Sequence, residues 1–190
     1  MFLQELLHRY QPFDEQEAQM QVRLTRFLEN APPGAGEVFG RDLAGAAPHW
    51  GHVTGSAWIV NEAGSRTVLV HHAKLGKWVQ PGGHCDGEAN VLAVALREAK
   101  EETGLIVTPV DNDIFDIDVH LIPEYWSTPE HWHFDVRFLL QADDASVPQV
   151  SSESRAVRWV SLHEAVGLNN SQSLMRMINK TQRHFCSQQP

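Results

Sequence analysis

Apolar side chains near the start of the chain recur every three or four residues, and this spacing predicts two helices. In residues 2–10, and again in 15–30, the apolar positions fall on one helix face. Asp14 is expected to cap the second helix, because an aspartate oxygen accepts the free N–H groups of a first turn. The stretch "NAPPGAG" at 30–36 ends this helix. Residues 1–45 are therefore expected to form a helical extension packed on the domain that follows.

From residue 52 onward apolar and polar positions alternate, which is typical of strands. The segments expected to be strands are 52–60, 67–73, 114–122, 132–142 and 156–161, with a shorter one in "KWVQPGG" at 77–83. Residues 90–103 instead have helical spacing and end at Gly104, and two closing helices are expected over 161–168 and 171–185. Strands before and after a central helix predict an α/β (α+β) domain, which we place at residues 46–190.

The composition is that of a soluble globular protein and narrows the choice of partners. No apolar run approaches a membrane span, and the N-terminus lacks the apolar core of a secretory signal. Cys85 and Cys186 are too few for a disulfide framework, so a cytoplasmic protein with no membrane partner is expected. A net charge of −9 argues against broad binding to nucleic acid. The same charge repels a phosphate substrate unless the protein holds a divalent cation.

The stretch "REAKEETGL", residues 97–105, concentrates three glutamates on the central helix. Glu98 and Glu102 are one turn apart and Glu101 lies beside them, so all three share one face. Considered alone, a solvated helix face is the simpler interpretation. The glycine-rich turn "QPGGHCDGE" at 80–88 enters the same helix, however, and lets backbone approach a ligand closely. Together they favour a magnesium site, since Mg²⁺ binds a few carboxylates along with waters and phosphate oxygens.

Residues 82–105, "GGHCDGEANVLAVALREAKEETGL", resemble the signature of the Nudix hydrolases, G-x5-E-x7-R-E-U-x-E-E-x-G-U. The resemblance implies an α/β/α sandwich around a mixed sheet. It also implies a requirement for Mg²⁺ or Mn²⁺ and hydrolysis of the diphosphate linkage in a small nucleoside diphosphate derivative, by attack of water on phosphorus. Such a metal resolves the conflict between an acidic protein and an anionic substrate.

The resemblance also implies roles for individual residues. Glu98 and Glu102 correspond to metal ligands, and Glu101 corresponds to a ligand or to the base that orients water. The backbone carbonyl of Gly82 is a further implied ligand, and Arg97 is expected to orient the carboxylates.

The sequence departs from the Nudix signature at one position, that of the first glutamate in the signature. That position is Ala89, whereas Glu88 and Asp86 lie just before it. In the family this glutamate mainly supports the loop and the arginine, so its displacement affects the partner of Arg97 more than the metal site. Either Glu88 or Asp86 is expected to take its place.

Two later strands alternate polar and apolar residues and are candidates for the wall of a substrate pocket. Their polar side chains are His131, His133, Asp135 and Arg137 in one segment and Asp116, Asp118 and His120 in the other. If the two strands pair, these polar faces can recognise substrate or hold an extra metal ion; an exposed antiparallel face is an equally simple interpretation. A zinc site formed by His120, His131 and His133 is a weaker alternative.

Other candidates lie around the glycine loop. Residues that can meet phosphates there are His84, Lys74, Lys77 and His72, each of which also fits a solvated turn. Glu153 precedes the last strand, where some Nudix enzymes supply a catalytic or metal-binding acid, although a surface acid is the simpler interpretation. Trp126 and Tyr125 can stack on a base or plug their loop. The remaining tryptophans considered, Trp50, Trp58, Trp78 and Trp159, are expected in the core.

Two other functions are open at this level. One is a Nudix domain that senses a ligand without turnover, although the helix glutamates are intact and residues 1–45 lack a basic recognition helix. The other is an enzyme similar to the isopentenyl diphosphate isomerases, which use a cysteine, with Cys85 as the candidate. The substrate is left open among oxidised nucleotides, nucleotide sugars and ADP-ribose, and the protein is expected to be a monomer or homodimer.

Overall fold

The computed structural model describes residues 3–30, 51–124 and 129–187. Its helices are α1 (Leu3–Arg9), α2 (Glu15–Glu29), α3 (Val91–Thr103), α4 (Leu162–Leu168) and α5 (Gln172–Cys186). Its strands are β1 (Gly51–Val60), β2 (Arg66–His72), β3 (Trp78–Val79), β4 (Gly82–His84), β5 (Thr108–Pro109), β6 (Asp116–Ile122), β7 (His131–Gln141) and β8 (Ser154–Ser161). The expected helices and the five longer strands are confirmed, with small shifts at their ends. The single short strand expected in 77–83 is instead two strands, β3 and β4, and β5 was not expected.

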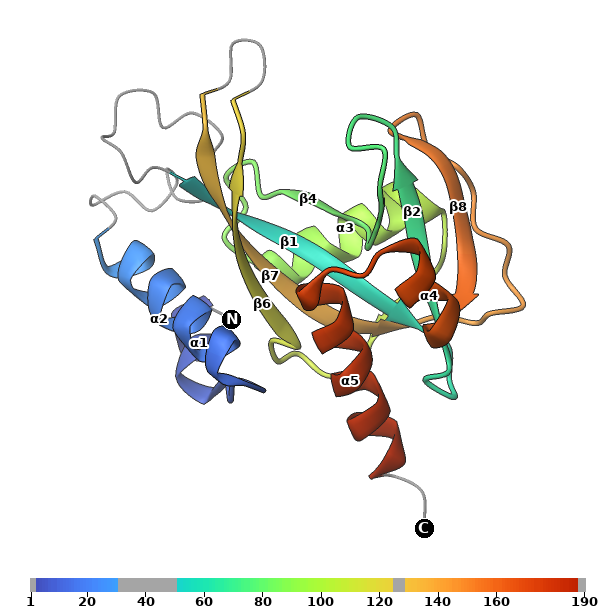
Figure 1. Cartoon of the computed structure of the whole chain (residues 1–190), viewed down its shortest axis with the longest axis horizontal. Coiled ribbons are helices and arrows are strands. Elements are labelled where there is room, and N and C mark those ends of the chain that lie inside the picture. Colours follow the sequence, from blue (N-terminus) through green and yellow to red (C-terminus); the bar gives the residue numbers. More distant parts are fainter. Residues whose placement is uncertain (1–2, 31–50, 125–128, 188–190) are drawn as a thin grey trace.

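The strands form one mixed sheet around β1 (Figure 1). β1 runs parallel to β7, from Gly51 opposite Trp132 to Val60 opposite Gln141. The other pairings are antiparallel: β4 and β2 pair with β1, β8 and β3 with β2, and β5 and β6 with β7. The expected hairpin of β6 and β7 is therefore present, and the predicted α/β class with a mixed sheet is confirmed.

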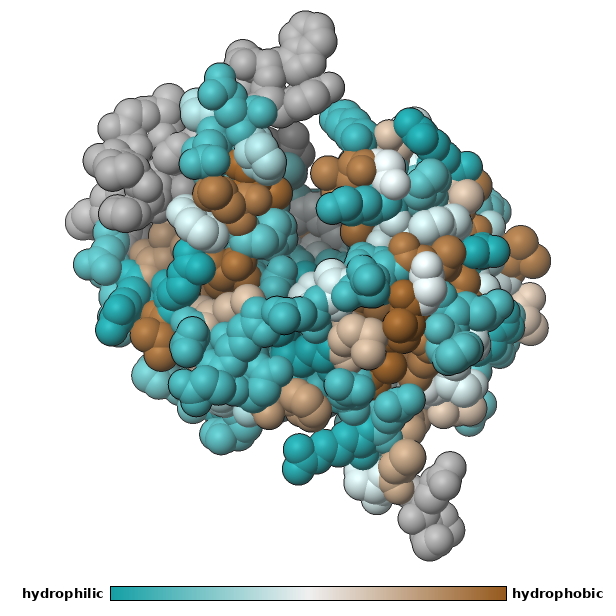
Figure 2. Space-filling model, in the orientation of Figure 1, coloured by the Kyte–Doolittle hydropathy of each residue, from teal (hydrophilic) through white to brown (hydrophobic). Residues whose placement is uncertain are grey.

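The two faces of the sheet are covered by different helices, as Figure 1 shows. Residues such as Val53, Ala57 and Phe138 pack on the face that meets α3, in one core with α1 and α2. Trp58 and Leu139 lie on the other face and pack against α4 and α5 in a second core. These layers form the expected sandwich. Among the described residues on the face in Figure 2, hydrophobic residues form separate patches between hydrophilic ones.

The tryptophans expected in the core differ in burial. Trp58 is fully buried and Trp159 is nearly so, whereas Trp78 is only partly buried against the second core. Trp50 lies outside the described residues, as do Tyr125 and Trp126. The interpretation is therefore confirmed for two of these side chains.

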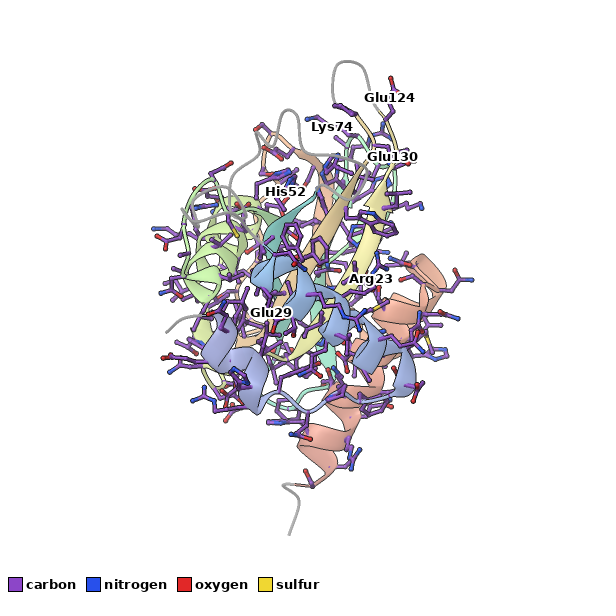
Figure 3. All side chains as sticks on the ribbon, turned by 90° about the vertical axis from the view of Figure 1, so that its left-hand side faces the viewer. Arg23, Glu29, His52, Lys74, Glu124 and Glu130 are labelled. Atoms are coloured by element: carbon purple, nitrogen blue, oxygen red, sulfur yellow. The ribbon has the colours of Figure 1, made fainter. Side chains whose placement is uncertain are left out.

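The N-terminal helices pack on the outer strands of the sheet. The Asp14 carboxylate accepts the N–H of Glu17 at 2.8 Å and caps α2 as expected. The ring of Phe27 stacks on Phe134 with centroids 4.1 Å apart, and the guanidinium of Arg23, labelled on α2 in Figure 3, lies 4.1 Å from the Trp132 ring. α1 and α2 therefore pack against the core, while the predicted extension over residues 1–45 stays a prediction, because its boundary lies outside the described residues.

A buried network of charges joins α2, the β6–β7 hairpin and α5. Its members are Glu17, Asp116, Asp118, Asp135, Arg137, Arg176 and Lys180. The Arg176 guanidinium donates to both oxygens of Asp116, at 2.8 and 3.0 Å, and Lys180 donates to Glu17. Each charge is thus paired, which is the condition under which buried charges are tolerated.

This network should make stability depend on pH in the acid range. Burial opposes the charge of Asp118, but Arg137 and a hydrogen bond from His120 outweigh it, so the pKa of Asp118 lies below its ordinary value. The unfolded state therefore takes up a proton first as pH falls, and this stabilisation, present above pH of about 4, is lost below it. We expect the urea midpoint of the wild type to fall more steeply between pH 5 and about 3 than that of Asp118→Asn. Equal slopes would contradict this role for Asp118.

Candidate active site

The three glutamates of the motif lie on α3. Residues at each end of this helix determine where it starts and where it stops. The Asn90 side chain accepts the N–H of Ala93 at 3.4 Å, and Gly104 ends the helix in the left-handed conformation with φ of 68°. Glu102 is only 6% exposed, whereas Glu101 on the same helix is exposed. The helix thus presents one buried and one exposed carboxylate, with Glu98 partly buried one turn before Glu102.

Strand β4 lies directly against these carboxylates. The backbone N–H of Gly82 donates to Glu102 at 3.0 Å. The Arg97 guanidinium donates to the carbonyl oxygen of His84 at 2.8 Å and to Glu98 at 2.9 Å. The glycine loop and the helix are therefore fixed to each other through the residues of the motif, and Arg97 holds Glu98 as expected.

Gly83 allows this close approach, because a Cβ there would lie 2.6 Å from the carboxyl carbon of Glu98. We expect Gly83→Ala to displace that carboxylate and to lower turnover about 10- to 100-fold, since small misplacements at a reacting centre have effects of that size. The matched control is Gly167→Ala, where a Cβ meets nothing within 4 Å. Steady-state kinetics of both variants, with circular dichroism to confirm folding, checks this. Wild-type turnover in Gly83→Ala would rule out a tight fit of loop and helix.

Burial and the neighbouring carboxylates raise the pKa of Glu98 and of Glu102. Burial raises the pKa of Glu102 to about 7, opposed by the Gly82 N–H and reinforced by the charges of Glu98, Glu153 and Glu101. Burial also raises the pKa of Glu98, with smaller contributions from Glu101 and Glu153. Glu153 is therefore close enough to act on both. A group of hard oxygen donors that disfavour each other's charge fits a divalent cation such as Mg²⁺.

Glu153 reaches this group from the loop before β8. Its carbonyl oxygen accepts the N–H of Ala73 at 2.9 Å, which ties that loop to the turn after β2. Lys74 is exposed in the same turn. Burial lowers the pKa of His72, opposed by the charge of Glu153 and reinforced by that of Lys74. The charge of Glu153 thus acts on Glu98 and Glu102, whereas Lys74 lies in the turn that the Glu153 loop contacts, and its contact with phosphate stays a prediction.

The residues before Ala89 do not substitute for the displaced glutamate in the same way. The Glu88 carboxylate accepts the N–H of Asn90 at 2.7 Å and supports the start of α3. Asp86, with a positive φ of 51°, contributes to the raised pKa of Arg97 after Glu98 and Glu101. Within the part of the chain that the structure describes, Arg97 donates to the His84 carbonyl and to Glu98 and makes no hydrogen bond to Glu88 or Asp86, although the charge of Asp86 acts on its pKa.

The predicted substrate residues fall into separate groups. The rings of His84, His131 and His133 gather on the face of β4 away from Glu98, next to the ring of His52. Burial and the neighbouring histidines lower the pKa of His133 to about 2, so it is neutral. Arg137 is 3% exposed and pairs with aspartates of the buried network. Its geometry favours a structural role, and a substrate contact from Arg137 stays a prediction.

The sequence interpretation missed His52, Glu17, Arg176 and Lys180 as parts of these clusters. Alternating polar residues at the start of β1, His52, Thr54 and Ser56, are the signal that could have revealed a polar face there. Thr54 and Ser56 both donate to the Asp135 carboxylate, at 2.9 and 2.8 Å. The other three depend on long-range packing, which no local pattern signals.

Two features lie outside the carboxylate site. Cys85 is buried, and burial raises the pKa of its thiol to about 12, which makes it a poor nucleophile. This argues against the isomerase-type alternative. A cavity of about 560 Å³ lies away from the carboxylate site, between α1, α5 and residues 111–115, and no residue of the motif lines it.

Comparison with known proteins identifies the class to which this fold and site belong. The NUDIX domain model matches residues 51–180, and the chain therefore belongs to the Nudix family. It is 28% identical over 122 residues to the asymmetrical bis(5'-nucleosyl)-tetraphosphatase of Mus musculus, covering 62% of this chain and 75% of that protein. It is 31% identical over 99 residues to the RNA pyrophosphohydrolase of Sphingopyxis alaskensis, covering 46% of this chain and 62% of the relative.

A solved structure has the same fold. The fold superimposes on an Ap4A hydrolase of C. elegans, determined as a binary complex, with a TM-score of 0.57 and 18% identity. The match covers 71% of this chain and 98% of the other. The protein is thus a hydrolase acting on acid anhydrides, of a family that generally needs a divalent metal. No helix within residues 3–30, 51–124 and 129–187 is long and apolar enough to cross a membrane.

Proposed function

We propose that the protein cleaves the diphosphate linkage of a small nucleoside diphosphate derivative with the help of Mg²⁺ or Mn²⁺. The observation that carries this is the position of Glu98 and Glu102 against the glycine strand β4, where burial, reinforced by the charges of Glu101 and Glu153, raises the pKa of both. The family assignment supports the same reaction. Glu98, Glu102 and Glu101 are the proposed metal ligands, with the carbonyl of Gly82 as a further one.

Each residue of the site has a defined task in this proposal. A bound divalent ion supplies Lewis-acid stabilisation of charge on the phosphate oxygens and a more acidic water. Arg97 holds Glu98 in place, and the Gly82 N–H holds Glu102. Exposed Glu101, or Glu153 across the site, accepts the proton of the water that attacks phosphorus. Lys74 is the proposed contact to the departing phosphates, whereas the rings of His84, His131 and His133 lie on the face of β4 away from Glu98.

The chemistry of the relatives suggests which substrates to try first. The mouse and worm relatives are named for dinucleoside tetraphosphate hydrolysis, and the bacterial relative is named for RNA. For this chain, the net charge of −9 favours a small substrate over nucleic acid. We infer a cytoplasmic enzyme that acts as a monomer or homodimer.

A substrate panel tests the proposal. It comprises a dinucleoside tetraphosphate, ADP-ribose, a nucleotide sugar, an oxidised nucleoside triphosphate and 5'-triphosphorylated RNA, each with Mg²⁺ and read by phosphorus NMR. We expect cleavage of at least one of the small compounds at a phosphoanhydride bond, and slower cleavage of the RNA. Binding of a nucleotide without cleavage of any compound would replace this proposal by the ligand-sensing function.

A further inference from the structure

Five histidines gather at one end of the sheet, on the face of β4 away from the glutamates. They come from four strands: His52 from β1, His84 from β4, His120 from β6, and His131 and His133 from β7. The ring of His52 lies 4.6 Å from that of His133 and 5.0 Å from that of His131, measured between centroids. Figure 3 places His52 in the same upper part of the molecule as Lys74 and Glu130, the residue before β7.

Three of these histidines bring ligand atoms together. One ring nitrogen each from His52, His131 and His133 lies within 4.8 Å of the other two. The Nε2 atoms of His131 and His133 are 3.2 Å apart. Two nitrogens bound at roughly 2.0–2.1 Å to one tetrahedral zinc ion are separated by about 3.3 Å, so this pair already has the spacing of two zinc ligands.

The surroundings fix the orientation that a ligand needs. His131 Nδ1 lies 2.8 Å from the carbonyl oxygen of Pro129. A carbonyl only accepts, so Nδ1 carries the proton of this bond and Nε2 is the ring atom that faces His133. A backbone carbonyl holding the far nitrogen of a metal-bound histidine is the usual supporting contact at metal sites.

The sheet register explains why these residues meet. In the parallel pairing of β1 with β7, His52 is opposite His133. His131 lies two residues before His133 on β7, so its side chain points to the same face of the sheet. In the pairing of β1 with β4, His84 is opposite Thr54, so its side chain shares this face, whereas Gly83 faces Glu98 on the other. The cluster is thus separated from the carboxylate site by the thickness of one strand.

We propose that His52, His131 and His133 form a second metal site, selective for Zn²⁺ or a similar transition-metal ion and distinct from the carboxylate site on α3. Imidazole nitrogens suit zinc, whereas carboxylate oxygens suit magnesium, so the two sites differ in the ion that they prefer. Three protein ligands leave a fourth position for water, a substrate oxygen or the neighbouring His84. The predicted trio of His120, His131 and His133 is corrected at one member, because His52 takes the place of His120.

Metal analysis of the purified full-length protein tests this site directly. The protein is treated with chelator, dialysed, and titrated with Zn²⁺ in excess Mg²⁺, which occupies the carboxylates. We expect one tightly bound Zn²⁺ per chain, and visible absorption typical of tetrahedral nitrogen coordination when Co²⁺ replaces it. Failure of the wild-type protein to bind Zn²⁺ under these conditions overturns the proposal without any variant.

Variants locate the ion. His133→Gln and, separately, His131→Gln are expected to weaken Zn²⁺ binding at least about 100-fold, since loss of even a supporting contact costs 10–100-fold. The matched control is His163→Gln, an exposed histidine on α4, which should bind as the wild type does. Glu102→Gln should also retain Zn²⁺, so failure of the proposed hydrolytic function and failure of this site are separate results. Zn²⁺ lost in Glu102→Gln but kept in both histidine variants would assign the ion to the carboxylates instead.

Discussion

Replacing Glu102 with glutamine is expected to lower turnover at least about 10²-fold, because removal of one charge-stabilising group in an active site typically has an effect of that size. Glutamine keeps the volume of the side chain and can still accept the Gly82 N–H, which donates to Glu102 at 3.0 Å. What it removes is one negative charge from the cluster of Glu98, Glu101 and Glu153. The loss should therefore appear in kcat and in the affinity for Mg²⁺, while the fold is retained.

Glu29→Gln is the matched control, since Glu29 is exposed on α2 and appears there in Figure 3. It makes the same chemical change away from the motif and should have wild-type kinetics. The measurement is the rate of cleavage of the best substrate of the panel over a range of Mg²⁺ concentrations. Wild-type rates in Glu102→Gln at every Mg²⁺ concentration would falsify the assignment of α3 as the metal-binding helix.

Replacing Arg176 with methionine is expected to lower the free energy of unfolding by about 3 kcal/mol, the lower end of the range for removing one member of a buried ion pair. The Arg176 side chain is 2% exposed and donates to both oxygens of Asp116 and to the carbonyl of Ile117. Methionine fills much of the same space but leaves Asp116 with only Arg137 and Lys180 as cations. The loss reflects uncompensated negative charge rather than a cavity.

Arg155→Met provides the control for this change, because Arg155 is exposed on β8. It should shift the free energy of unfolding by no more than about 0.5 kcal/mol, as exposed substitutions usually do. Urea denaturation of both variants at pH 7 gives the comparison. Equal stabilities of Arg176→Met and the wild type would mean that the network contributes to something other than stability.

The motif on α3 could be predicted from the sequence because its geometry is local. Three glutamates at i, i+3 and i+4 share a face on any helix, and the glycines before them determine how closely the loop can approach. The Nudix resemblance then implied the partners of these residues. The structure agrees on the position of Arg97, Glu98 and Glu102 against β4.

The histidine cluster and the charged network could not be predicted in the same way, because they depend on register between distant segments. His52 meets His133 only through the parallel pairing of β1 with β7, which joins positions 81 residues apart. A shift of one residue in that pairing would turn its side chains to the opposite face. The sequence pattern placed Arg137 on the same polar face as the histidines. Its burial depends instead on α5, which packs over the part of the hairpin that contains Asp116 and Ile117.

The most direct test of the central claim is the hydrolysis rate of the chelator-treated wild-type protein on its best panel substrate, before and after addition of Mg²⁺. Because Glu98, Glu101, Glu102 and Glu153 place several carboxylates around one site, the bare protein repels an anionic substrate and lacks the charge that stabilises the reaction. The predicted result is no measurable cleavage without Mg²⁺ and full cleavage on its return, with the oxygen of solvent water found on a phosphate product. Cleavage at the same rate in the metal-free protein would contradict the account.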